Sequence, residues 1–173
     1  MIWLQYFHWV FLTGAAGLTI AAAVSDARSF RIPNWVWAGL AALFPLYVLS
    51  APREVPWEQH IGVSALVLAI GFALFAGNFA GAGDVKFLAA TALWSGPKLI
   101  GVLLVVTGLA GGVLALGYVM AGLWARNRTS AEGAASLPGG IMHGLTKVAI
   151  PYGIAIAAGS LAAFGMMADP ALF

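Results

Sequence analysis

The chain has 173 residues, of which 62% are hydrophobic and only 8% are charged, and its formal net charge is +2. A soluble domain carries about 25% charged residues, so this composition excludes a water-soluble core and indicates a protein whose solvent is lipid. The basic residues form short clusters beside apolar runs, which excludes a nucleic-acid partner, and the lack of cysteine excludes disulfides and thiolate metal sites.

Six apolar segments follow one another along the chain, and each is predicted to be a membrane-spanning helix. They cover residues 3–25, 34–50, 60–80, 85–96, 99–124 and 148–167. The fourth would extend only about 18 Å at 1.5 Å per residue. Gly96-Pro97 is expected to end it, because proline disfavours helix at the residue before it. The predicted fold is an all-α polytopic membrane protein with one domain over residues 1–173.

The first segment is predicted to stay in the mature protein. Ala21-Ala22-Ala23 resembles the small-residue site at which a signal peptide is cut. A signal peptide begins with a positive region, however, and the first basic residue of this chain is Arg28.

Lysine and arginine predict the orientation in the membrane. A six-span arrangement places most of them on one side, which is therefore expected to be the cytoplasm, with both termini outside. The cytoplasmic group is Arg28, Arg31, Lys86, Arg126, Arg128 and Lys147, whereas Arg53 and Lys98 lie on the other side. Residues 125–147 are predicted to be a flexible cytoplasmic connector, because they are polar and then rich in glycine and proline.

Two of the few aspartates, Asp26 and Asp84, lie at the ends of apolar segments on the predicted cytoplasmic side. An acid at the edge of hydrocarbon is costly, so it normally marks a pathway or an active site. Gly81 and Gly83 come just before Asp84, and their lack of side chains leaves room for another chain to approach. Both aspartates are therefore candidate catalytic residues.

The residues around the two aspartates have simpler interpretations as well. Arg28 and Arg31 could pair with Asp26 at the lipid headgroups, and Lys86 could either tune Asp84 or extend its ammonium to the interface. Pro33 is expected to break the first helix, with Asn34 as the N-cap of the second.

A pair of carboxylates suits the hydrolysis of a peptide bond. One ionised acid takes a proton from water, and one neutral acid polarises or protonates the substrate. Two carboxyls a few ångströms apart cannot both ionise cheaply, so the pair carries one proton. This chemistry requires no metal and no cofactor, and the spacing of His8, His60 and His143 does not suggest metal ligation.

The chain resembles the type IV prepilin peptidases, which belong to the membrane aspartic proteases with a Gly-x-Gly-Asp motif. The resemblance is carried by Asp26-x-Arg28-x-x-Arg31-Ile32-Pro33-Asn34, by Gly81-Ala82-Gly83-Asp84-Val85-Lys86, and by the run from Lys147 to Gly153. It implies a helical bundle of that protease type, in a bacterial inner membrane, with Asp26 and Asp84 as the catalytic pair. It also implies an endopeptidase that removes a short basic leader from prepilins or pseudopilins at the cytoplasmic face.

One departure from the family indicates a subtype. Longer members carry an additional cytoplasmic region with paired cysteines and also methylate the new N-terminus. This chain has no cysteine and no room for that region between its first spans. It looks like the short form associated with Flp (tight-adherence) pili, and methylation is not expected.

Other readings of the same aspartates remain open. An ion-coupled transporter would usually place its acids near mid-membrane in two related halves. A structural component of a secretion or pilus machine would use the acids only to pair with arginines. A presenilin-like protease would need its first acid in a different setting from the one around Asp26. The sequence does not indicate the oligomeric state.

Overall fold

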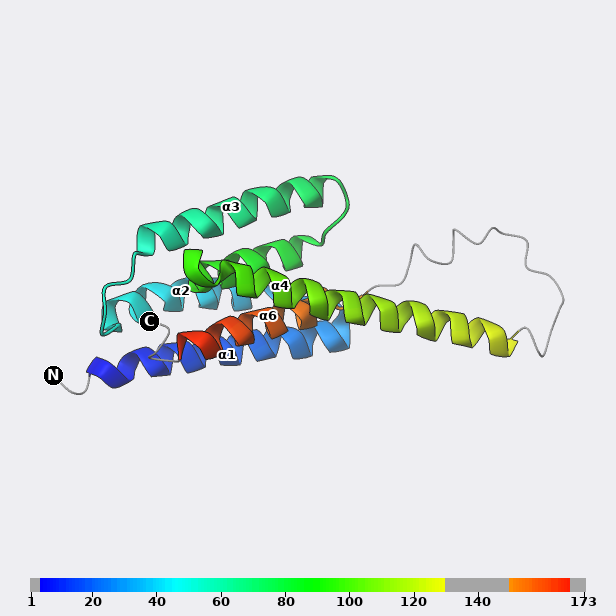
Figure 1. Cartoon of the computed structure of the whole chain (residues 1–173), viewed down its shortest axis with the longest axis horizontal. Helices are drawn as coiled ribbons and strands as arrows, with labels where there is room; N and C mark the ends of the chain where they lie inside the picture. The colour runs from blue at the N-terminus through cyan, green and yellow to red at the C-terminus, as the bar shows by residue number, and fades with distance from the viewer. Residues whose placement is uncertain (1–3, 130–149, 169–173) are drawn as a thin grey trace.

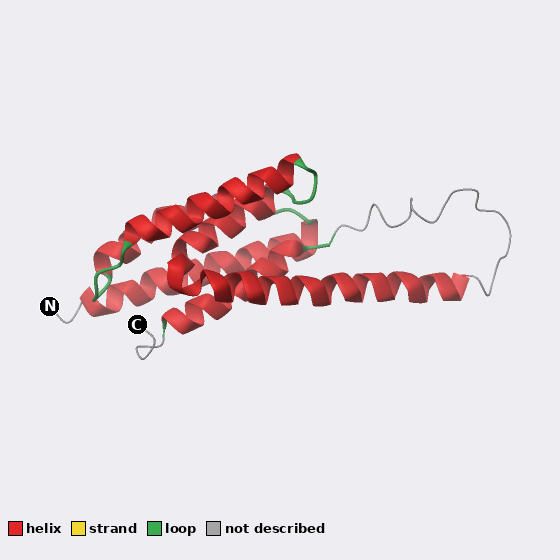
Figure 2. Ribbon diagram, turned by 45° about the horizontal axis from the view of Figure 1, so that its top comes forward, coloured by secondary structure: helices red, strands yellow, loops and turns green. Residues whose placement is uncertain are grey.

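The computed structural model describes residues 4–129 and 150–168, which form a bundle of helices without strands (Figures 1 and 2). This confirms the all-α prediction. The helices are α1 (Leu4–Ser29), α2 (Asn34–Ser50), α3 (Trp57–Ala76), α4 (Ala82–Thr129) and α6 (Tyr152–Met167).

The helices differ from the predicted segments at several ends. Helix α1 continues through Asp26 to Ser29, because nothing before Phe30 breaks the helix, so Asp26 lies inside α1 rather than after it. Helix α3 begins and ends earlier than the predicted 60–80. Its end is set by Asn78, which has φ 63°, and by the N–H of Phe79, which donates to the Leu74 carbonyl at 2.9 Å, as in a Schellman motif.

The predicted break at Gly96-Pro97 is confirmed as a kink inside α4. Gly96 has φ 56° and ψ −169°, outside the helical region, so α4 consists of two helices that meet at this residue, in agreement with the separate predicted segments 85–96 and 99–124. Pro97 has no N–H to offer the Leu93 carbonyl one turn earlier. His60 of α3 replaces it, because its Nδ1 lies 2.8 Å from the Leu93 oxygen and a carbonyl can only accept.

The core lies between α1, α2, α6 and the first half of α4. Trp94 of α4 is fully buried at its centre, and its Nε1–H donates to the Leu40 carbonyl of α2 at 2.9 Å. The Trp94 ring packs against Phe44 and Phe164, with centroids 5.8 Å away in each case. The core therefore fixes α2, α4 and α6 against one another.

Small residues allow α6 to approach α4 closely. Gly159 of α6 lies against the backbone of α4 at Leu103 and against Thr107, so that a Cβ at Gly159 would collide with both. Helix packing through small residues is typical of membrane helices, because it brings backbones into direct contact.

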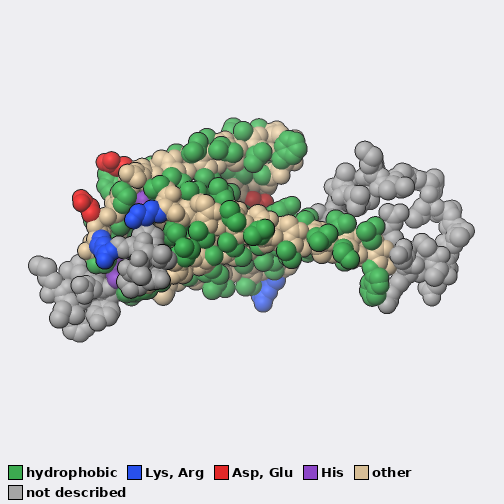
Figure 3. Space-filling view, in the orientation of Figure 1, with side chains coloured by type: hydrophobic (Ala, Val, Ile, Leu, Met, Phe, Trp, Pro, Cys, Tyr) green, Lys and Arg blue, Asp and Glu red, His purple; other side chains and the backbone are tan. Residues whose placement is uncertain are grey.

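The outer surface is mostly apolar. Figure 3 shows hydrophobic side chains along most of the visible length of the helices, with charged side chains gathered at two levels. Leu49, Leu109 and Val113 are 80%, 68% and 71% exposed. Within residues 4–129 and 150–168, three helical stretches are long and apolar enough to cross a bilayer, namely Phe7–Ser29, Trp57–Ala76 and Ala82–Trp124, while α2 and α6 are shorter apolar helices. Such a surface fits lipid, which supports a membrane protein.

Candidate active site

A cavity of about 360 Å³ lies at the end of the bundle where α1 ends and α2, α4 and α6 begin. Both candidate aspartates line it. The full lining is Asp26, Phe30, Arg31, Ile32, Asn34, Gly81, Ala82, Gly83, Asp84, Lys86 and Ile150. Residues from widely separated parts of the chain are thus brought to one place.

Asp26 projects from the last turns of α1 into the start of α6. Its side chain is 4% exposed, and its Oδ2 accepts a hydrogen bond from the Gly153 N–H at 2.7 Å. Gly153 lies in the first turn of α6, where backbone N–H groups have no partner within the helix and the helix dipole favours negative charge. The Gly153 N–H and the positive end of the α6 dipole therefore stabilise a negative charge on the buried Asp26 carboxylate.

Gly153 also leaves the space that Asp26 occupies. A Cβ at Gly153 would lie 2.8 Å from Oδ2, 2.9 Å from Cβ and 3.0 Å from Cγ of Asp26. No real side chain tolerates such contacts with a short buried acid, so only glycine can offer its N–H to Asp26 at this distance.

Asp84 is the third residue of α4 and lies partly buried in its first turn. The Gly81 N–H donates to its carboxylate, while the Gly81 carbonyl accepts the first helical hydrogen bond, from Val85 N–H, at 3.1 Å. An acid that reaches back from the third helical position in this way forms half of a capping box. The turn that starts α4 therefore fixes the position of the carboxylate.

The two carboxylates lie close enough for their charges to interact. The loop between α1 and α2 links the residues around Asp26 to those around Asp84, because Ile32 of this loop packs on Gly83. A Cβ added at Gly83 would lie 3.6 Å from the Ile32 Cβ. Ser25 Oγ holds the same loop by donating to the Arg31 carbonyl at 2.8 Å. The arrangement can place a water molecule or a peptide carbonyl between two acids.

Phe30 ends α1 in a left-handed conformation, with φ 52°, which is uncommon for a residue other than glycine. Its N–H donates to the backbone carbonyl of Asp26 at 2.9 Å, as at a helix end with an αL residue. The ring is 49% exposed at the edge of the cavity. Phe30 therefore turns the chain directly after Asp26.

The structure corrects the role expected for Asn34. Pro33 occupies the N-cap position of α2, and no side chain caps this helix. Asn34 is the first helical residue, and its Oδ1 accepts a hydrogen bond from Trp37 Nε1 at 3.2 Å. The Lys86 ammonium lies 5.5 Å from the centroid of the Trp37 ring, a cation–π distance. One indole thus links Asn34 and Lys86 beside the cavity.

Neither arginine of the first motif pairs with Asp26 in the described part of the chain, where Asp26 is hydrogen-bonded to Gly153 instead. Arg31 is exposed and lines the cavity, whereas Arg28 is exposed and lies outside the lining. Lys147, His143 and most of the predicted connector 125–147 lie outside the described residues, as does the start of the predicted segment 148–167.

Sequence reasoning did not assign a role to Gly153, Trp37 or Phe30. A signal for Gly153 was present, because Pro151 favours a helix start and a glycine in the first helical turn leaves an accessible N–H. Nothing in the sequence indicates that this N–H meets Asp26, since the two residues are 127 positions apart.

Comparison with known protein families gives one match that bears on this site. The family model described as "Type IV leader peptidase family" matches residues 13–116, a range that contains both aspartates but not Gly153. No curated protein and no solved structure matches the chain.

Proposed function

The chain belongs to the type IV leader peptidase family, and on that premise we propose that it is a membrane aspartic endopeptidase in which Asp26 and Asp84 form the catalytic pair. The observation that carries the proposal is the shared cavity, which both carboxylates line and in which their charges interact. Asp26 comes from α1 and Asp84 from α4, so the fold brings together two acids that lie far apart in the chain.

Hydrolysis would proceed through a pair that shares one proton. The ionised carboxylate takes a proton from water while the water oxygen forms a bond to the scissile carbonyl carbon, and the neutral carboxyl hydrogen-bonds the carbonyl oxygen. The C–N bond then breaks, the amine nitrogen receives a proton from the pair, and the product acid and the free amine leave. The pair ends with one proton, as it began.

Two backbone N–H groups would hold the pair in place. Gly153 donates to Asp26 from the first turn of α6, and Gly81 donates to Asp84 from the position just before α4. Donors fixed by helix starts do not need to reorganise during the reaction, which is the main source of electrostatic catalysis in enzymes.

The substrate class follows from the family and from the position of the cavity. We propose that the chain removes the basic leader of type IV prepilins, with the leader in the cytoplasm and the following apolar helix of the substrate in the bilayer. The loop between α1 and α2 spans only residues 30–33, too short for the cysteine-bearing region of longer members. This supports the short Flp-type form without N-methylation.

The membrane arrangement is proposed as six crossings in an inner membrane, with the cavity at the cytoplasmic face and both termini outside. The kink at Gly96 would divide α4 into two crossings, with Lys98 just beyond it. Arg28, Arg31 and Lys86 lie at the cavity end, which agrees with the positive-inside rule.

The test is cleavage of a prepilin expressed together with this protein, followed by gel shift, for Asp26→Asn and Asp84→Asn. Each substitution keeps the shape of the side chain but removes the acid, so each should abolish leader removal while the protein still accumulates in the membrane. Glu58→Gln is the matched control, because Glu58 is an exposed acid in the first turn of α3, outside the cavity.

Retained cleavage in either aspartate variant would remove that residue from the mechanism. Loss of cleavage in Glu58→Gln at normal protein levels would show that the assay responds to any change of charge. A transporter or an assembly component would leave the prepilin uncut even with the unaltered chain.

A further inference from the structure

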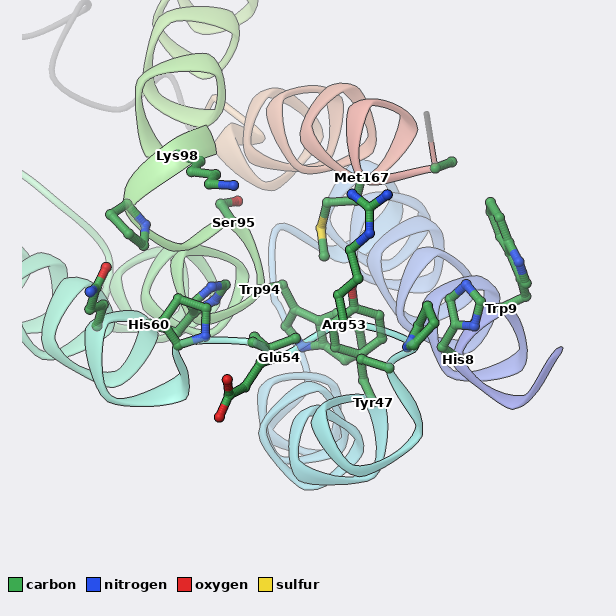
Figure 4. A pocket seen from close by; sticks show the side chains of 17 residues that line it. His8, Trp9, Tyr47, Arg53, Glu54, His60, Trp94, Ser95, Lys98 and Met167 are labelled. Carbon is green, nitrogen blue, oxygen red and sulfur yellow. The ribbon is translucent and has the colours of Figure 1, made fainter. Parts of the chain in front are cut away.

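A second cavity, of about 420 Å³, lies at the opposite end of the bundle from Asp26 and Asp84. Figure 4 shows the side chains that line it. It is formed where α1 and α3 begin, where α2 and α6 end, and at the kink of α4. This volume is in the range of sites that hold small molecules. No role in peptide hydrolysis follows from its position, because the helices separate it from the aspartates.

The charged residues of this cavity favour an anion. Arg53 and Lys98 come from different segments, Lys98 already has an interaction partner in the structure, and Glu54 is the single acid among the described lining residues, so Arg53 is the basic group that the anion would meet. Figure 4 shows Arg53 extending across the opening towards Met167, while the Glu54 carboxylate points to the other side. An arginine guanidinium matches the geometry of a phosphate group, because its N–H donors form a planar fork.

The remaining lining favours a ligand that has an apolar part and hydroxyl groups. Tyr47, which is half-buried, contributes aromatic surface, and the exposed Gln59 contributes a polar group. His60 donates its Nδ1 proton to the Leu93 carbonyl, so its neutral ring has Nε2 as an acceptor for a hydroxyl.

The apolar surroundings of the cavity indicate that the bound phosphate would belong to a lipid. The surface next to the cavity is apolar, since Val10, Leu49 and Ile61 are 60%, 80% and 49% exposed. Trp9 and Trp57 are 40% and 50% exposed at the same end, and tryptophan is enriched at headgroup depth. An arginine at the level of the headgroups attracts anionic lipids, because its guanidinium matches the charge and the geometry of their phosphate.

We propose that this cavity binds the headgroup of an anionic glycerophospholipid. Arg53 is the main contact of the lipid phosphate, and the hydroxyls of the glycerol headgroup lie towards His60. The acyl chains would lie on the adjoining apolar surface of the helices. This inference does not depend on the proposed peptidase activity, because none of the residues it uses lines the other cavity.

The test uses the full chain purified in a neutral detergent and titrated with dioleoyl phosphatidylglycerol in mixed micelles, with bound lipid counted by native mass spectrometry. Dioleoyl phosphatidylcholine and inorganic phosphate are the comparison probes. One phosphatidylglycerol should bind saturably, phosphatidylcholine should not compete, and excess phosphate should not displace the lipid.

Variants of opposite charge sharpen the test. Arg53→Gln removes a charge-assisted contact and should weaken phosphatidylglycerol binding about tenfold or more, whereas Glu54→Gln removes a repelling charge and should strengthen it. Both residues are exposed in a loop between helices, so neither substitution should prevent folding. Arg28→Gln is the matched control, because it removes the same charge from the other end of the bundle and should leave this binding unchanged.

Equal binding of phosphatidylcholine, or an equal loss of affinity in Arg28→Gln and Arg53→Gln, would overturn the proposal. Displacement by inorganic phosphate alone would also overturn it, since the cavity would then be a site for a free anion. A fall in affinity in Glu54→Gln would contradict the assigned direction of the charge effect.

Discussion

At the scale of single residues, the contact between Asp26 and Gly153 is the tightest constraint in the candidate active site. Gly153→Ala would place a methyl group about 3 Å from three atoms of Asp26 and push the carboxylate away from its position. A displacement of about 1 Å in a catalytic group can cost about 100-fold in rate. We expect kcat for leader cleavage to fall by about that factor, measured on purified protein with a prepilin peptide.

Gly165→Ala supplies the control for this prediction, because it lies in the same helix and a Cβ there would meet nothing within 4 Å. Its cleavage rate should match that of the unaltered chain. Equal rates for both alanine variants would contradict the assigned role of Gly153.

Phe30 stores backbone strain next to Asp26, since its φ is 52°. Phe30→Ala and Phe30→Gly both remove the ring, but only glycine adopts this conformation without cost. We therefore expect Phe30→Gly to be more stable than Phe30→Ala by about 1 kcal/mol. Denaturation in detergent micelles measures the difference, and a Phe30→Ala variant of equal or greater stability would contradict it.

At the scale of helices, the α4–α6 contact depends on one small residue. A Cβ at Gly159 would collide with the Thr107 hydroxyl and with the Leu103 carbonyl, and the carbonyl cannot move without shifting the backbone of α4. Overpacking of this kind costs about 1–3 kcal/mol. Gly159→Ala should lower the thermal midpoint of the purified protein, whereas Gly101→Ala, at an open position of α4, should leave it unchanged. Equal midpoints for the two variants would show that α6 adjusts without cost.

The helices themselves could be predicted to within a few residues at most ends, because long apolar runs have few alternatives to helix. The kink was predictable from Gly96-Pro97, since a proline inside a helix removes a hydrogen bond and the glycine before it can leave the helical conformation. The hydrogen bond of His60 to Leu93 was not, because it depends on how α3 packs against α4. The closeness of Asp26 and Asp84 was suggested by their common membrane face, but the Gly153 partner needed the tertiary structure.

The Asn34 prediction failed for a local reason. Asparagine is a good N-cap, but Pro33 has the extended conformation of the capping position, with φ −63° and ψ 141°. The helix therefore starts one residue later, and the Asn34 side chain bonds Trp37 instead. Sequence preference for a residue type could not decide between these two neighbouring positions.

At the scale of the whole molecule, the positions of the basic residues make a test of topology direct. The chain has no cysteine, so single cysteines can be introduced without background. Arg28→Cys and Lys86→Cys, both exposed, should react with a membrane-impermeant maleimide only after intact cells are opened. Arg53→Cys should react from outside. Labelling of positions 28 and 86 from opposite sides would contradict the proposed common face of the aspartates.

The hydrogen bond between Asp26 and Gly153 has a consequence for biosynthesis. Asp26 is made with α1, whereas its partner Gly153 is carried by α6, which is synthesised after α4. A nascent chain that stops before α6 holds both acids yet lacks the amide that orients one of them. Translation must therefore have passed α6 before this hydrogen bond can form, so the candidate site cannot take its final arrangement while only α1 to α4 have been made.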